Sequence, residues 1–96
     1  MPEDDSSEKT EIVASMRIDA VLSGISKQSR GQIQKMINSQ LVKLNWHDVI
    51  DFNIMVKEND VLSLRNFGRI LIEDVSATRK GKYKVVFKLW QTKKRN

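Results

Sequence analysis

Apolar residues recur at helical spacing in the first half of the chain. A first helix is expected to begin near Ser15, a capping residue, and to end at Gly24 and the polar residues after it. Its apolar positions are Ile18, Val21, Leu22 and Ile25. Ser29 followed by Gln32 has the pattern of a capping box, which predicts a second helix that stops near Ser39. Two short helices joined by about four residues are typical of a helical corner.

Beyond the second helix the spacing changes to alternation, which is typical of strands. The expected strands cover residues 41–46, 47–50, 61–65, 69–75 and 82–90, with a turn at Asn45-Trp46 and a loop at 51–60. In the last strand Val85, Phe87 and Leu89 share one face, which is expected to point into the core. The pattern predicts an α+β fold in which two short helices pack against a small, mostly antiparallel sheet.

Charge divides the 96 residues unevenly. Residues 1–11 carry a net charge of −4, whereas the whole chain carries +5. Residues 1–14 are therefore expected to form a disordered acidic leader, 15–90 a single domain, and 91–96 a basic tail. A basic body of this kind favours a polyanionic partner such as nucleic acid.

Several functional classes find no support in the residues. His47 is the only histidine, no nucleophile is paired with it, cysteine is absent, and no glycine-rich phosphate loop occurs. We therefore expect no catalytic residue, no metal site and no cofactor. No apolar run approaches the length that a membrane span needs, so no membrane partner is expected either. The chain is also expected to be a monomer.

The basic residues near the helical corner suggest a phosphate-binding surface. Arg17 and Arg30 stand at the beginnings of the two helices, and Lys35 and Lys43 follow. A helix N-terminus adds free N–H groups and positive potential, which attract phosphate. Trp46 at the strand tip either stacks on a nucleobase or covers an edge of the core.

Four segments together resemble the S4 RNA-binding domain. They are MRIDAVLS at 16–23, SRGQIQKMI at 29–37, LVKLNW at 41–46 and ENDVLSLR at 58–65. RNFGRILIEDV and RKGKYKVVF, which follow, are similar to the C-terminal domain of the YlmH group. A stand-alone mitochondrial S4-like protein is the competing resemblance.

The resemblance implies an S4-like fold and non-catalytic binding of structured RNA, either rRNA or tRNA. Carried over by position, the RNA-binding residues would be Arg17, Ser29, Arg30, Gln34, Lys35, Asn38, Lys43 and Asn45. It further implies association with the large ribosomal subunit, in translation or in quality control of stalled ribosomes. The expected location is the bacterial cytoplasm, with the mitochondrion or plastid as the alternative.

Two positions depart from the S4 pattern, because Gln40 and Asn59 stand where the family usually has glycine. If position 40 requires positive φ, glutamine is strained there or the turn is remodelled, whereas asparagine at 59 tolerates that conformation better. Two other functions remain open. One is an RNA-targeting module of an RNA-modifying enzyme such as a pseudouridine synthase, and the other is a protein-interaction domain with a basic face.

Overall fold

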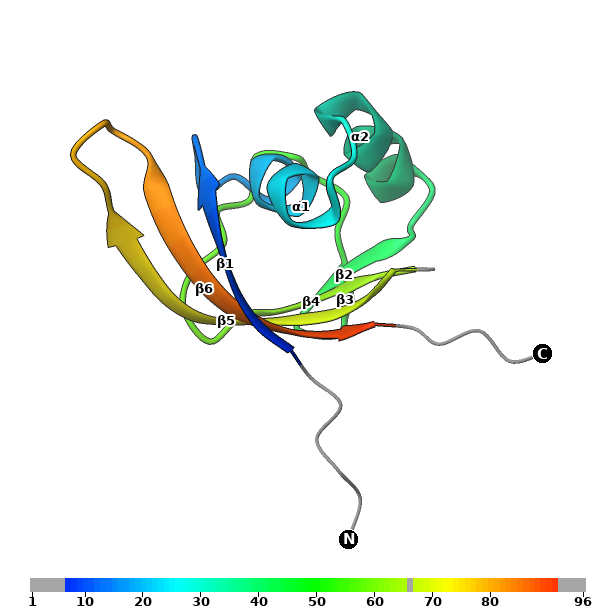
Figure 1. The fold of residues 1–96 in the computed structure, drawn as a ribbon. Coiled ribbons are helices and arrows are strands. Elements are labelled where there is room, and N and C mark those ends of the chain that lie inside the picture. Colours follow the sequence, from blue (N-terminus) through cyan, green and yellow to red (C-terminus); the bar gives the residue numbers. More distant parts are fainter. Residues whose placement is uncertain (1–6, 66, 92–96) are drawn as a thin grey trace, which may run out of the picture.

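The computed structural model describes residues 7–65 and 67–91, which form two helices and a six-stranded sheet. The elements are β1 (Ser7–Val13), α1 (Ile18–Ser26), α2 (Arg30–Asn38), β2 (Val42–Leu44), β3 (His47–Asp48), β4 (Val61–Leu64), β5 (Gly68–Ala77) and β6 (Tyr83–Gln91). The strand order is β1-β6-β5-β4-β2-β3, and every neighbouring pair is antiparallel. Both helices lie over the same face of the curved sheet (Figure 1). The predicted α+β class is therefore confirmed.

The core fills the space between the helices and the inner face of the sheet. Val85, Phe87 and Leu89 alternate inward along β6 as predicted, and Phe87 is only 2% exposed. Ile33 and Ile37 form the buried stripe of α2. A side chain on the inner sheet face is thus shielded by a helix, while its strand neighbours point to the opposite face.

The strand β1 corrects the prediction of a disordered leader for residues 7–13. It pairs with β6 from Ser7 opposite Leu89 to Val13 opposite Tyr83. The side chain of Val13 is buried, and the ammonium of Lys27 lies 2.9 Å from Glu11. Backbone pairing with a distant strand orders this polar segment, and such pairing leaves no apolar periodicity in the sequence. Residues 1–6 and 92–96 of the expected leader and tail lie outside the described residues.

The boundaries of α1 also differ from the prediction. The helix begins at Ile18 with Arg17 as its N-cap, and the Ser15 hydroxyl accepts a hydrogen bond from the Arg17 N–H. It continues through Gly24, where a Cβ atom would lie 2.8 Å from a methyl carbon of Val13. Glycine at this position therefore allows β1 to approach the helix closely. Within the described residues, no helix is long and apolar enough to cross a membrane.

The turn between β2 and β3 holds two residues at positive φ. Asn45 and Trp46 have φ values of 51° and 71°, and Leu44 pairs with His47 across the turn. This geometry belongs to a two-residue hairpin, in which the second position normally favours glycine. Trp46 is 64% exposed, so it does not cover an edge of the core.

Gln40 occupies the left-handed conformation that favours glycine, with a φ of 62°, so the turn keeps this geometry with glutamine in place. Replacing Gln40 by glycine should raise the free energy of unfolding by about 0.5–1 kcal/mol, because glycine adopts this φ without steric cost. Urea denaturation measures the change. Lys35→Gly, on the exposed interior of α2, is the control and should lower stability by about 1 kcal/mol. A Gln40→Gly variant less stable than the parent protein would contradict the strain argument.

Candidate nucleic-acid interface

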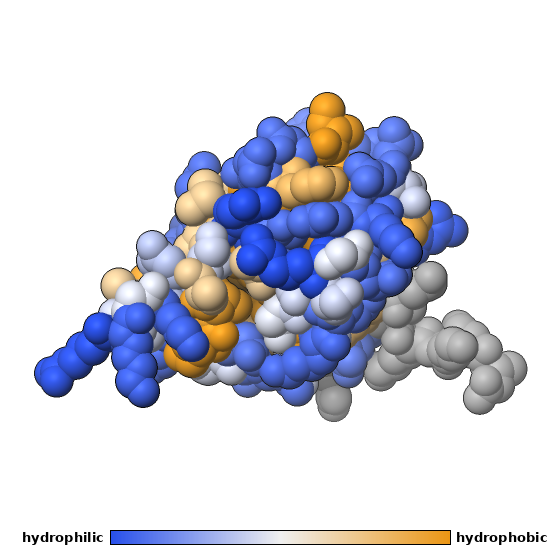
Figure 2. All heavy atoms as spheres, turned by 90° about the horizontal axis from the view of Figure 1, so that it is seen from above, coloured by the Kyte–Doolittle hydropathy of each residue, from blue (hydrophilic) through white to orange (hydrophobic). Residues whose placement is uncertain are grey.

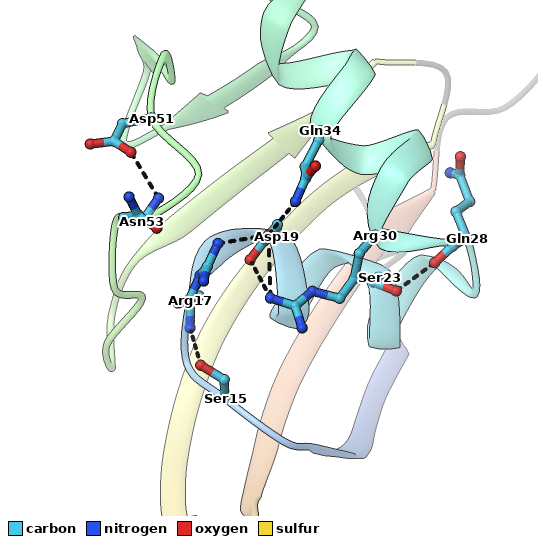
Figure 3. Close-up of polar contacts among 9 residues, drawn as sticks. All are labelled: Ser15, Arg17, Asp19, Ser23, Gln28, Arg30, Gln34, Asp51 and Asn53. Atoms are coloured by element: carbon cyan, nitrogen blue, oxygen red, sulfur yellow. Dashed lines mark hydrogen bonds and ion pairs between the residues drawn. The ribbon is translucent and has the colours of Figure 1, made fainter.

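A fully buried carboxylate joins the two helices at their corner. Asp19, in the first turn of α1, is 0% exposed and accepts hydrogen bonds from three side chains (Figure 3). The terminal guanidinium nitrogen Nη2 of Arg17 lies 3.2 Å from Oδ2, and Nε2 of Gln34 lies 2.9 Å from the same oxygen. Nη2 of Arg30 lies 3.3 Å from Oδ1. Asp19 therefore ties the beginning of α1 to the first two turns of α2.

The charges around Asp19 keep this carboxyl ionised. Burial alone raises the pKa of Asp19, because it penalises the charged form. The hydrogen bond from Gln34, the positive charges of Arg30 and Arg17, and the backbone N–H of Ala20 act in the opposite direction. The net result is a pKa below its ordinary value, so Asp19 is an anion at neutral pH.

Both arginines remain accessible while they hold Asp19. The side chain of Arg17 is 36% exposed and that of Arg30 is 48% exposed. Arg30 contacts Asp19 only through Nη2, so Nη1 and Nε form no hydrogen bond with the described residues. The Ser29 hydroxyl caps α2 by accepting the Gln32 N–H, as the capping-box pattern predicted. The corner thus presents two partly exposed guanidinium groups next to a helix N-terminus.

Other candidate residues continue this surface along α2. Gln34 and Asn38 follow Arg30 at intervals of four residues, which places the three on one side of the helix. Lys35 is exposed beside them. Figure 2 shows that the face carrying the helices is mostly hydrophilic, with scattered apolar patches. Asp19, which joins these side chains, was not among the residues that the sequence predicted to bind RNA.

Of the two remaining residues predicted to bind RNA, one lies on another face of the protein and the other already forms hydrogen bonds within it. Lys43 points away from the helices, because Val42 before it is buried on the inner face of β2. Asn45 donates to the Asp60 carboxylate at 3.1 Å and accepts from the Val61 N–H at 2.9 Å. Its amide therefore fixes the β2–β3 turn against the start of β4. Among the described residues, no three His, Asp or Glu side chains are placed to hold a metal ion.

Comparison with known proteins gives one informative match. No model of a known protein family matches the chain. Over 80 residues, the chain is 40% identical to the ribosome-associated protein quality control protein P2 of Bacillus subtilis (strain 168). The aligned region covers 82% of this chain and 31% of that protein. Most of the chain is therefore similar to a segment of about a third of a ribosome-associated quality control protein.

Proposed function

We propose that this chain is an S4-type RNA-binding domain similar to the C-terminal domain of the YlmH group, and that it binds structured RNA without catalysing a reaction. The observation that carries the proposal is the cluster in which buried Asp19 holds Arg17, Arg30 and Gln34 at the helical corner. These three residues were candidates on sequence grounds, and the structure brings them within hydrogen-bonding distance of one carboxylate. The cluster fixes the positions of two arginines without covering them.

The arrangement suits recognition of an RNA backbone. A guanidinium group binds phosphate through two parallel hydrogen bonds, and Arg30 keeps Nη1 and Nε free of described partners for this purpose. Because Asp19 already restricts the arginine side chains, less conformational entropy is lost when phosphate binds. The base edges of an RNA duplex lie in a deep, narrow groove, so folded RNA is recognised mainly through backbone and shape. Gln34 and Asn38 supply polar groups along the same side of α2.

Similarity to the Bacillus subtilis protein supports a ribosomal setting for this RNA. On that basis the RNA is rRNA or tRNA on the large ribosomal subunit, and the process is translation or the quality control of stalled ribosomes. The corresponding location is the bacterial cytoplasm, and the chain acts there as a monomer. The net charge of +5 is consistent with a polyanionic partner.

Replacing Arg30 by alanine should weaken binding to a structured RNA hairpin about 5–10-fold and leave the fold intact, because the side chain is half exposed. The slope of log K against log salt concentration should fall by about one unit, corresponding to one lost phosphate contact. Arg30→Lys should restore binding only in part, because an ammonium group keeps the charge but cannot form the two parallel bonds. Fluorescence anisotropy of labelled RNA at several salt concentrations measures these effects.

Lys84→Ala is the charge-matched control for this experiment. Lys84 is an exposed residue of β6, opposite Ser76 and Ile12, on the sheet face that the helices do not cover. Its removal should change hairpin binding by less than about twofold. Equal losses from Arg30→Ala and Lys84→Ala would mean that the chain attracts RNA only through its overall charge, and the proposed interface would be wrong.

A further inference from the structure

Four side chains form a row across the sheet face opposite the helices. Lys43 of β2 pairs with Ser63 of β4, Ser63 with Arg69 of β5, and Arg69 with Trp90 of β6. Residues next to them in the strands point to the opposite face and are buried; they include Val42, Leu64, Ile70 and Leu89. Directly paired residues on neighbouring strands lie close together, so the row is one continuous feature.

An open groove of about 680 Å³ accompanies this row at the end of the sheet where β4 leads into β5. Arg65 adds a third cation to its lining, beside Lys43 and Arg69. Gly68 fixes the close approach of β5 and β6 here, because a Cβ atom would collide with the carbonyl oxygen of Trp90. The start of β5 and the end of β6 lie side by side here, because Gly68 pairs with Gln91 (Figure 1).

The charged side chains that line this groove are all positive. None of the described residues that line it is acidic, and its three cations form no ion pair with described residues. The other polar lining groups are Gln40, Ser63 and Gln91, which can donate hydrogen bonds. Trp90 contributes a half-buried aromatic ring at the end of the row. A groove that combines several cations with an aromatic ring matches the chemistry of single-stranded nucleic acid, in which phosphates alternate with stacking bases.

We propose that this groove binds a single-stranded segment of RNA, with Lys43, Arg65 and Arg69 on the phosphates and Trp90 against a base. The inference rests on the proposed function and extends it to a second surface. The helical corner lies on one side of the sheet and the row on the other. One domain therefore contacts two RNA segments at once, a folded segment at the corner and an unpaired segment in the groove. Lys43 belongs to this second surface.

The test uses the full chain and a labelled oligouridylate about eight nucleotides long, a length within the range of known single-strand sites. Arg69→Ala and Trp90→Leu should each weaken its binding about tenfold, since a stacked base or a phosphate contact contributes on that order. Lys84→Ala, on the same sheet face but outside the groove, should weaken binding by less than about twofold. Arg30→Ala should weaken binding of the structured hairpin and leave oligouridylate binding unchanged.

A direct readout comes from tryptophan fluorescence. The chain has two tryptophans, so Trp46→Phe leaves Trp90 as the sole source of tryptophan emission. Oligouridylate should quench this emission if a base stacks on the ring. Trp90→Phe keeps an aromatic ring and should retain most of the binding. Circular dichroism verifies that each variant is folded. If Trp90→Leu unfolds, Arg69→Ala and the quenching experiment still test whether the groove binds single-stranded RNA.

The possible results separate the two surfaces. If Arg69→Ala binds oligouridylate as tightly as the parent protein, or if oligouridylate does not quench Trp90, the groove does not bind single-stranded RNA. Either result would leave the effect of Arg30→Ala on hairpin binding unchanged. An aspartate-rich peptide that competes as effectively as unlabelled oligouridylate would also overturn the assignment, because the groove would then show no preference for RNA over an acidic protein. Loss of oligouridylate binding in Arg69→Ala, with hairpin binding unaffected by Arg30→Ala, would support the groove and refute the helical corner.

Discussion

Replacing Phe87 by alanine is expected to lower the free energy of unfolding by about 3–5 kcal/mol, the usual cost of removing a buried aromatic side chain. Phe87 is 2% exposed and lies near the middle of β6, opposite Lys9 of β1 and Ile72 of β5. The helices and the sheet both border the space that its ring fills, so neighbouring side chains can close the cavity only in part. Small domains have about 5–15 kcal/mol of stability in total, so this single change removes a large share.

Urea denaturation followed by circular dichroism measures this loss. Val86→Ala is the matched control in the same strand, because Val86 is half-buried on the opposite face and should cost less than about 1.5 kcal/mol. A Phe87→Ala variant as stable as Val86→Ala would mean that the ring contributes little to the core. An unfolded Phe87→Ala variant beside a folded Val86→Ala variant would agree with the upper end of the expected range.

Replacing Asp19 by asparagine is expected to lower the free energy of unfolding by about 2–3 kcal/mol, with almost no change of volume. The amide offers one acceptor oxygen where the carboxylate offered two, and its NH₂ group would face at least the Arg30 donor whichever way the amide turns. A buried donor without an acceptor carries its full desolvation cost. Asp51→Asn is the control, since Asp51 is an exposed loop residue whose side chain, among the described residues, accepts a hydrogen bond only from the Asn53 N–H.

The contribution of Asp19 should depend on pH in a definite direction. Its pKa is lowered in the folded state, so its stabilising effect is complete above the unfolded pKa of about 3.9 and is lost as pH falls through the folded value. The stability difference between the parent protein and Asp19→Asn should therefore narrow below about pH 4. A difference that stays constant between neutral and strongly acidic pH would exclude ionised Asp19 as the cause.

The same variant tests whether Asp19 positions the arginines. Asp19→Asn raises the net charge by one, which alone would tighten RNA binding. If Asp19 holds Arg17 and Arg30 in place, the structured hairpin should instead bind more weakly in the folded variant. Tighter binding would show that Asp19 only reduces the positive charge of the corner.

Local signals in the sequence predicted that both helices exist and predicted the cap of α2, because these signals depend on neighbouring residues, but they misplaced the ends of α1. The cap of α2 needs only Ser29 and the Gln32 N–H, and both are in place. The long alternating segments gave β5 and β6, because one face of each strand is buried by the helices. The strand β1 was not predicted, because this segment becomes ordered by pairing with β6, which is far away in sequence. Gly24 was read as a helix end for a related reason, since the contact with Val13 that requires glycine is not visible locally.

The candidate site was predictable where one element positions the residues. The 3.6-residue period of α2 places Arg30 and Gln34 on one side, and the packing of the corner adds Arg17. Alternation in β2 also determines the direction of Lys43, but only after the buried face of the strand is known. The two hydrogen bonds that engage Asn45 depend on β4, which contacts the turn only in the folded chain. Motif positions alone therefore could not separate a residue that holds the turn from one that faces a ligand.

The pairing of β1 with β6 has a consequence for the order in which the strands fold during synthesis. Among the described residues, the first strand in chain order pairs with the last, since β1 lies at the sheet edge and its Val13 is opposite Tyr83 of β6. Contacts between such distant segments form late, because a long loop must close before they contribute stability. While translation has not reached β6, Ser7–Val13 lacks the strand with which it pairs. Emergence of Gln91, the final residue of β6, therefore completes the pairing of β1 with β6.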